Sequence, residues 1–514
     1  MKRQTQNSDA IISLLAAVSI LMVSCNFSQQ QKEDNQFRCE CSKFGIDPLW
    51  ADSNKVSCYQ IPVHKNVAAP DSGKYSLAVV IAKTMHETIQ PPLLYLHGGP
   101  GIATIENVKR YLQSPTWKLL REQRNLVFFD YRGTGYSEPE LCDYIQDSLA
   151  LFNSTNPSSQ DESEKEITLY KNCRDSLLSA GISLSDFTSF QLAADAEAIR
   201  RGLQIRDWNI YGVSYGTTIA LNLLRSFPSN IKSVILDSPY PPNAPWVDFV
   251  RPFDTCFSAL ENSLLSDSVY AKLFPFIRKD FVRAVTRLNG KPVQLSTEEN
   301  GTTTKYDYDG DEFAWSIWSA MLSPKSIPYV PSAIQEIANG NDSILQQWST
   351  IFSSPDAFGE FSEPQSNAIL CYEARPQKFE DSEESLIEKY PDFISFNSGY
   401  NTQLCEVWRP DIAPKEIFKP VVSDVPVLIL SGEFDPVCPP LFGKITSQTL
   451  TNSTLIIVPA ASHAAIHADD CLRNIANDFI SDPGKRPLMQ CVSARKKINF
   501  VTSDLTTALM NYGK

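Results

Sequence analysis

Short apolar runs that alternate with longer helical patterns constrain the fold of this chain more than any other feature. Runs in which nearly every residue is apolar are typical of strands buried on both faces of a parallel sheet. A long gap before the last two runs indicates one α/β sheet interrupted by an insertion, whose aromatic-rich helical patterns predict a lid. The runs lie at residues 76–82, 92–97, 125–130, 208–212 and 232–237, and then at 425–430 and 454–458.

The length and composition agree with a folded protein of two lobes. A chain of 514 residues exceeds what one hydrophobic core usually serves. We therefore expect a core built from residues 41–240 and 421–514, and a lid at 241–420. With 42% hydrophobic and 20% charged residues, the composition is that of an ordinary globular protein. A net charge of -13 does not attract a phosphate backbone, which argues against nucleic acid as a partner.

Residues 1–24 have the features of an export signal. Lys2 and Arg3 precede an apolar run at 10–23 that is too short to span a bilayer comfortably. Because the run ends in a small residue followed by Cys25, it resembles a bacterial lipoprotein cleavage box. Cys25 is thus predicted to carry a lipid anchor in the cell envelope, with residues 25–40 as a tether and no other membrane contact. A plain secretory signal and a retained anchor are the alternatives.

The cysteines predict disulfides. Twelve of them are many for a reducing compartment, and export favours their pairing. Zinc is the other use of clustered cysteines, but the chain has no paired C-x-x-C and no His-rich partner segment. Three expected pairs each close a loop of about 20 to 35 residues and contribute about 3 kcal/mol. They are Cys142 with Cys173, Cys371 with Cys405, and Cys471 with Cys491, while Cys39 and Cys41 compete for Cys58.

The sequence Gly-Val-Ser-Tyr-Gly at 212–216 follows a predicted strand and precedes a helical run at 217–227. In this context a sharp turn holds the serine in a strained conformation, and the two glycines let strand and helix approach closely. The bare pattern arises by chance often enough to be weak, but its position between a strand and a helix makes it specific. Ser214 is therefore the predicted nucleophile.

A serine hydroxyl needs a base, and the base needs a carboxylate that orients it. Only His463 and His467 follow Ser214 in the chain. His463 comes directly after the last predicted strand and is the predicted base, while His467, in or beside the next helix, is the alternative. Asp435 follows the preceding strand and is the predicted acid, because a proline ends its turn and could fix its carboxylate. Glu433 is the alternative acid.

The oxyanion that forms during acyl transfer needs N–H donors. The Gly-rich segment 97–101 directly follows a predicted strand, so its backbone amides can converge with the amide of Tyr215. Pro100 has no N–H, which makes Gly99 the predicted donor beside Tyr215. This chemistry needs no cofactor, and no metal site is predicted.

Taken in order, five segments resemble those of the prolyl and tripeptidyl aminopeptidases, and the resemblance spans about residues 77–491. It implies an α/β-hydrolase fold, with a mostly parallel central sheet, helices on both faces and a large, mainly helical lid. It also implies an exported serine exopeptidase that acts on the free N termini of peptides. Thr217, where prolyl members commonly have a second glycine, favours the tripeptidyl branch. The segments are HGGPG at 97–101, DYRGTGYS at 130–137, GVSYGT at 212–217, GEFDPV at 432–437, and Ser462-His463 followed by Cys471 and Cys491.

The resemblance also implies roles for residues outside the triad. In the family, the segment at 130–137 is a loop beside the oxyanion hole, and Arg132 is expected to brace it through an ion pair. Acids of the lid hold the free α-ammonium of the substrate. Because residues 367–373 resemble a lid segment of the tripeptidyl branch, Glu373 is the candidate for this task and Glu406 the second candidate.

Fold and triad together do not define a substrate. A lipase-like hydrolase of small esters could use the same triad. A surface binding protein on an inactive hydrolase scaffold is the alternative from another class, and the intact set of three residues argues against it.

Overall fold

The computed structural model describes residues 36–86, 90–153, 158–244, 249–299, 302–352, 360–374 and 402–512. The predicted signal, Cys25 and most of the predicted tether lie outside these residues. Among the helices that are described, none has the length and apolar character needed to cross a membrane.

Nine strands of the described chain form one sheet in the order β1-β2-β3-β5-β4-β6-β7-β10-β11. From β5 to β11 in this order all neighbours are parallel. The strands β1, β2 and β3 extend the sheet with antiparallel pairs. They are β1 (Arg38–Cys39), β2 (Val56–His64), β3 (Lys74–Ala82), β4 (Leu93–Leu96), β5 (Leu126–Phe129), β6 (Trp208–Val213), β7 (Ile231–Asp237), β10 (Val427–Gly432) and β11 (Ser453–Val458).

All seven predicted strands are present, with one difference in direction. The run at 76–82 was expected to be a parallel strand, yet β3 pairs antiparallel with both β2 and β5. Every residue of β4, β5, β6 and β10 is buried, as the apolar runs predicted. The mostly parallel sheet of the predicted fold class is confirmed.

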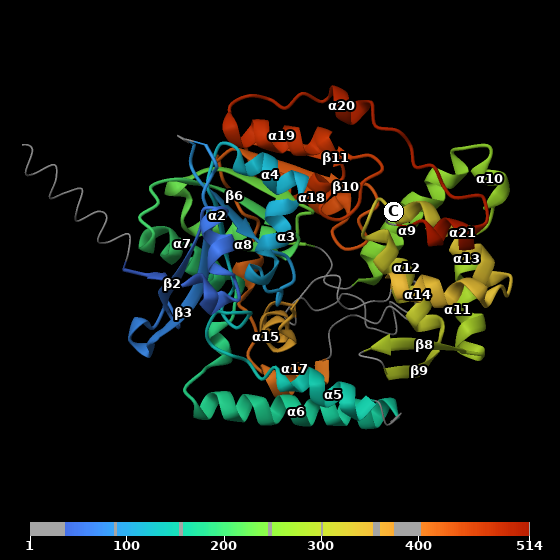
Figure 1. The fold of residues 1–514 in the computed structure, drawn as a ribbon, viewed down its shortest axis with the longest axis horizontal. Coiled ribbons are helices and arrows are strands. Elements are labelled where there is room, and N and C mark those ends of the chain that lie inside the picture. The colour runs from blue at the N-terminus through green and yellow to red at the C-terminus, as the bar shows by residue number, and fades with distance from the viewer. Residues whose placement is uncertain are drawn as a thin grey trace, which may run out of the picture.

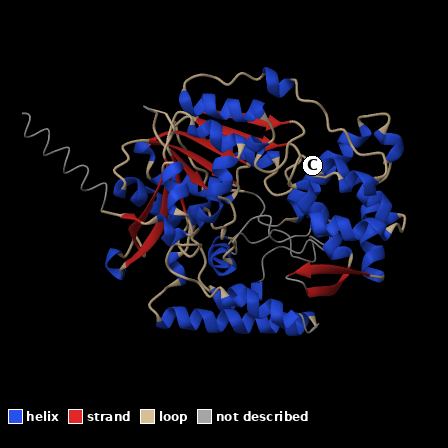
Figure 2. Ribbon diagram, in the orientation of Figure 1, coloured by secondary structure: helices blue, strands red, loops and turns tan. Residues whose placement is uncertain are grey.

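Helices cover both faces of the sheet (Figure 2). Alternate strand residues such as Leu94 and Ile210 pack with α7 and α8 on one face. Their neighbours, such as Tyr95 and Tyr211, pack with α3, α4 and α19 on the other. The two-sided burial explains why these strands lack polar alternation. The helices are α3 (Val108–Gln113), α4 (Pro115–Arg121), α7 (Ser189–Gly202), α8 (Tyr215–Ser226) and α19 (Asp470–Ser481).

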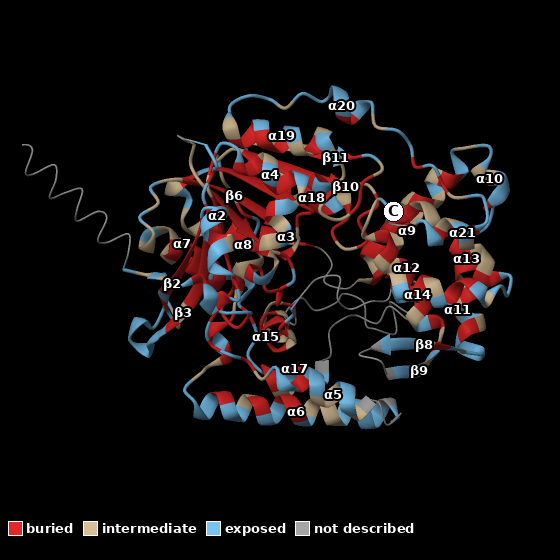
Figure 3. Cartoon of the chain, in the orientation of Figure 1, coloured by how far each residue is buried: buried red, intermediate tan, exposed pale blue. Residues whose placement is uncertain are grey.

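A second, mainly helical lobe lies beside the sheet and has its own hydrophobic cluster (Figures 1 and 3). A two-stranded hairpin within it was not predicted. Residues near the carboxyl end of the chain, including Phe500 and Leu505, belong to the same cluster. The lobe comprises α9 (Val250–Leu265), α10 (Tyr270–Leu273), α11 (Ile277–Gly290), β8 (Val293–Glu299), β9 (Thr302–Tyr308), α12 (Gly310–Met321), α13 (Val330–Ala338) and α14 (Leu345–Phe352), and α21 (Leu505–Met510) packs on it.

The later part of the insertion packs on the main core instead. Helices α15 (Glu363–Glu373) and α17 (Thr402–Trp408) contribute Ala368, Leu404 and Trp408 to the core beside the sheet. Helices α5 (Tyr144–Asn153) and α6 (Ser159–Ser179) cover this region, and α6 contacts α17. The helices of the predicted insertion thus divide between two hydrophobic clusters.

Four disulfides join the described residues, and the three predicted pairs are confirmed. They link Cys142 to Cys173, Cys371 to Cys405 and Cys471 to Cys491. Cys58 forms its disulfide with Cys41, although Cys39 is the residue opposite Cys58 in the β1–β2 ladder. Cys39, Cys256 and Cys438 are free thiols.

Candidate active site

The turn between β6 and α8 depends on glycine at two positions. Ser214 has φ 55° and ψ -127°, a backbone conformation that residues with a side chain rarely adopt. A Cβ on Gly212 would lie 2.7 Å from the carbonyl oxygen of Gly216. A Cβ on Gly216 would lie 2.1 Å from the carbonyl oxygen of Leu96. Strand and helix therefore meet too closely for any other residue, and the turn presents Ser214 at the carboxyl edge of the sheet.

Asp435 and His463 form a hydrogen-bonded pair at the same edge. Asp435 is fully buried, and its Oδ1 accepts hydrogen bonds from the amides of Val437 at 2.9 Å and Cys438 at 2.8 Å. The Nδ1 of His463 lies 2.9 Å from Oδ2 and 3.0 Å from Oδ1 of Asp435. With 16% of its side chain exposed, His463 lines the same cavity as Ser214. The structure thus bonds His463 to Asp435 and places His463 and Ser214 in the lining of one cavity.

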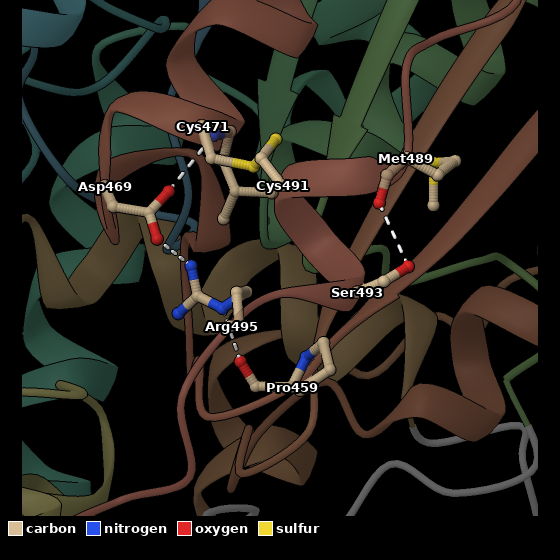
Figure 4. The surroundings of a disulfide bond; sticks show 8 residues. Pro459, Asp469, Cys471, Met489, Cys491, Ser493 and Arg495 are labelled. Carbon is tan, nitrogen blue, oxygen red and sulfur yellow. Dashed lines mark hydrogen bonds and ion pairs between the residues drawn. A yellow bond between two sulfur atoms is a disulfide. The ribbon is translucent and has the colours of Figure 1, made fainter.

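Glu433, the alternative acid, fixes the loop that carries His463. Its Oε2 accepts a hydrogen bond from the amide of Ala460 at 2.9 Å. Arg495 also holds this loop, because it donates to the carbonyl oxygen of Pro459 at 2.6 Å and pairs with Asp469 (Figure 4). The disulfide from Cys471 anchors the segment that bears this arginine.

The electrostatic environments of the two candidate bases differ. Burial disfavours the charged form of His463, but Asp435, through charge and hydrogen bonds, and then Asp237, through charge, raise the pKa of His463. Burial, aided by the charge of Arg473, lowers the pKa of His467 to about 4. His467 also lines the cavity, where its Nδ1 lies 2.8 Å from the hydroxyl of Thr116. Among the described residues, a carboxylate is bonded to His463 and none to the side chain of His467.

The Gly-rich loop after β4 passes directly against the nucleophile. A Cβ on Gly98 would lie 2.9 Å from the Cβ of Ser214. Gly99 has φ 108°, in the region that favours glycine. Neither the amide of Gly99 nor that of Tyr215 donates to a backbone carbonyl within the described ranges. The oxyanion role of these two amides stays a prediction.

Asp130, a buried residue of the segment 130–137, holds the residues that follow this loop. Oxygens of Asp130 accept hydrogen bonds from the amides of Thr104 at 2.7 Å, Ile105 at 2.8 Å and Tyr136 at 3.0 Å. Burial raises the pKa of Asp130 to about 6, against the hydrogen bonds that lower it. The carboxylate therefore ties the segment after the Gly-rich loop to its own segment.

Arg132 braces the segment through an ion pair, as predicted. Its guanidinium donates to both oxygens of Asp195, at 2.8 Å and 2.6 Å, and both side chains are buried. The same guanidinium donates to the carbonyl oxygen of Asp186 at 2.8 Å. A buried arginine of this kind depends on its partners, because the loss of one leaves an uncompensated charge.

Asp195→Ala is expected to lower the free energy of unfolding by about 3 to 5 kcal/mol, because Arg132 stays buried without its carboxylate. Denaturant unfolding of the purified protein measures the change. The matched control is Asp175→Ala, which breaks the exposed pair with Arg174 and should cost about 0.5 kcal/mol or less. Equal losses in the two variants would contradict the bracing role.

A cavity of about 920 Å³ opens over Ser214 and His463. The lid contributes apolar side chains to it, among them Phe249, Trp318 and Leu322. The lining also includes three acids, Glu140, Asp143 and Glu360, together with Arg110 and Phe361. Sequence reasoning did not single out these acids, although Glu140 and Asp143 follow shortly after the segment 130–137.

The two predicted substrate-binding acids lie elsewhere. Glu373 accepts hydrogen bonds from the amide of Ser189 at 2.7 Å and from the hydroxyl of Tyr215 at 3.0 Å. It lines a separate cavity of about 40 Å³, and burial raises its pKa. Glu406 is exposed on α17. Neither residue lines the cavity of Ser214, so Glu373 holds the side chain next to the nucleophile rather than a group in that cavity.

The fold and this arrangement define an α/β-type serine hydrolase, and comparison with known proteins agrees. A family model described as the alpha/beta hydrolase fold matches residues 91–470. The chain therefore belongs to the α/β-hydrolase family. The resemblance inferred from the sequence segments is confirmed at this level.

Several relatives are named as peptidases, and they match between about a third and nine tenths of the chain. "Serine protease Hip1" of Mycobacterium tuberculosis is 22% identical over 504 residues, which is 91% of this chain and 95% of that protein. "Probable proline iminopeptidase" of Leptolyngbya boryana is 21% identical over 389 residues, 73% of this chain and 82% of that protein. "Tripeptidyl aminopeptidase" of Streptomyces lividans is 27% identical over 194 residues, 37% of this chain and 36% of that protein.

Proposed function

We propose that this serine hydrolase is an exported aminopeptidase that releases short peptides from free N termini. Ser214 attacks the scissile carbonyl, and His463 takes the proton of the hydroxyl and delivers it to the leaving amine. Asp435 orients the imidazole and stabilises its charged form, and the amides of Gly99 and Tyr215 bind the oxyanion. Water then releases the acyl group. The observation that carries this mechanism is the bonding of Nδ1 of His463 to a fully buried Asp435, in a cavity shared with the strained Ser214.

The acids in the cavity lining support a substrate with a free α-ammonium. Burial raises the pKa of Glu360, and the nearby charges of Glu106 and Asp143 raise it further. Burial and then Glu140 raise the pKa of Asp143. Carboxylates crowded together in this way favour a cation between them. The names of the relatives, which include aminopeptidases, support the same class of substrate.

N-terminal acetylation of a peptide substrate is expected to lower kcat/KM by about 100-fold or more, because it removes the charge that the acidic residues would pair with. The measurement compares one peptide with its acetylated form. Glu360→Gln should reduce the ratio between the two forms while acting much less on the acetylated one. Equal rates for both forms, or activity on esters alone, would overturn the aminopeptidase proposal in favour of an esterase.

Export is part of the proposal and has independent support. Four disulfides form within the described residues, and such bonds persist in oxidising compartments. Attachment to the cell envelope through a lipid on Cys25 stays a prediction from the sequence.

A further inference from the structure

We propose that Asp237, together with Ser238, is a second positioning element of the active site, joining the turn of Ser214 to the loop of His463 and adding a charge beside the imidazole. The proposal rests on the triad proposed above. It concerns a carboxylate at the end of β7 that the mechanism does not otherwise use.

Asp237 is connected to the nucleophile through the backbone. It is the last residue of β7, is fully buried, and lies opposite Val213 in the parallel β6–β7 pair. Its carbonyl oxygen accepts a hydrogen bond from the amide of Ser214 at 3.0 Å. The strained turn is therefore held at its first residue by the strand that carries Asp237.

The same two residues hold the loop of the base. Oδ2 of Asp237 accepts a hydrogen bond from the amide of Ile466 at 3.1 Å. The hydroxyl of Ser238 accepts one from the amide of Ala464 at 2.9 Å. Because Ala464 directly follows His463, these bonds fix the backbone that presents the imidazole. One strand end thus sets the nucleophile and the base relative to each other.

Among the described residues, His463 is the group able to carry a positive charge that acts on Asp237. The ionisable groups that face Asp237 are the phenols of Tyr211 and Tyr95, the thiol of Cys438, and His463. Of these, only His463 can become positive. Tyr211 donates to Oδ2 at 3.2 Å, and Oδ1 has no hydrogen-bond partner in the part of the chain that the structure describes.

The ionisations of Asp237 and His463 therefore affect each other. Burial raises the pKa of Asp237 to about 7, although hydrogen bonds and the charge of His463 act to lower it. In turn, the charge of Asp237 raises the pKa of His463. Ionised Asp237 stabilises the imidazolium that forms when Ser214 loses its proton, and neutral Asp237 does not. Such a pair titrates as a unit rather than as two independent residues.

Asp237→Asn removes the charge but keeps the size of the side chain and its hydrogen bonds, since the amide oxygen can still accept from the amide of Ile466 and the hydroxyl of Tyr211. The readout is the rate at which a fluorophosphonate labels Ser214 from about pH 5 to about pH 9. Without the negative charge the pKa of His463 falls, so the acid limb of the profile should move to lower pH by about 0.5 to 1 unit. The plateau rate should fall by about tenfold, because the imidazolium is less stabilised. A purely structural role would not move the acid limb.

Ser238→Ala is the matched control. It removes the acceptor for the amide of Ala464 but no charge, so the labelling rate should fall while the acid limb stays in place. An acid limb that does not move in Asp237→Asn would overturn the inference while the triad stands. If Ser214→Ala still labels, the triad itself fails. Should Asp237→Asn not fold, the imidazole resonance of His463 in the unaltered protein should titrate in two coupled steps, and a single step would overturn the inference.

Discussion

Ser214→Ala is expected to lower the turnover of a free peptide by about 10⁴-fold or more, because no covalent acyl intermediate can form without the hydroxyl. The substitution removes one oxygen from a turn whose geometry depends on Gly212 and Gly216, so the fold should persist. Initial rates at saturating peptide measure the effect, and circular dichroism checks the fold. Ser179→Ala, at an exposed position, should retain full activity. Turnover within tenfold of the unaltered enzyme would remove Ser214 from the mechanism.

Asp435→Asn is expected to lower kcat by about 10⁴-fold, since the amide can hold the imidazole in the wrong tautomer and does not stabilise its charged form. The matched variant is Glu433→Gln. The side chain of Glu433 accepts a hydrogen bond from the amide of Ala460, which the glutamine carbonyl can also accept. Its effect should therefore be small. Comparable losses in the two variants, measured as kcat on one peptide, would contradict the assignment of the acid.

The sequence predicted the centre of the sheet well, because its strands are buried on both faces and appear as uninterrupted apolar runs. The same property does not reveal the direction of β3, because a buried apolar run has the same pattern in a parallel and in an antiparallel pair. Strand β2 was missed because Pro62 interrupts its pattern. The hairpin of β8 and β9 was missed because its residues are polar, with mixed exposure, in a segment expected to be helical.

The candidate triad could be predicted because each member lies in the loop or turn that follows a strand, and the carboxyl ends of parallel strands meet at one edge of a sheet. The substrate-binding acids could not be predicted in this way. Whether a lid carboxylate faces the cavity depends on packing, and Glu373 turns instead to Ser189 and Tyr215. The sequence analysis did not single out Asp237, although it is a charged residue at the end of a buried strand, at the same edge as Ser214.

The cysteine pairs show both the strength and the limit of spacing arguments. Three pairs follow from short loops between cysteines. The choice between Cys39 and Cys41 depends on local side-chain geometry. Cys39 is opposite Cys58 in the ladder, yet Cys58 forms its disulfide with Cys41. The spacing of the cysteines in the sequence does not show which of these two side chains reaches Cys58.

The most direct test of the account is the site at which a fluorophosphonate binds covalently to the intact protein, mapped by mass spectrometry of its peptides. We predict a single adduct on Ser214 that forms rapidly in the unaltered protein and is strongly suppressed in His463→Ala. An adduct on another residue, or undiminished labelling of Ser214 without the imidazole, would contradict the claim that these side chains act together.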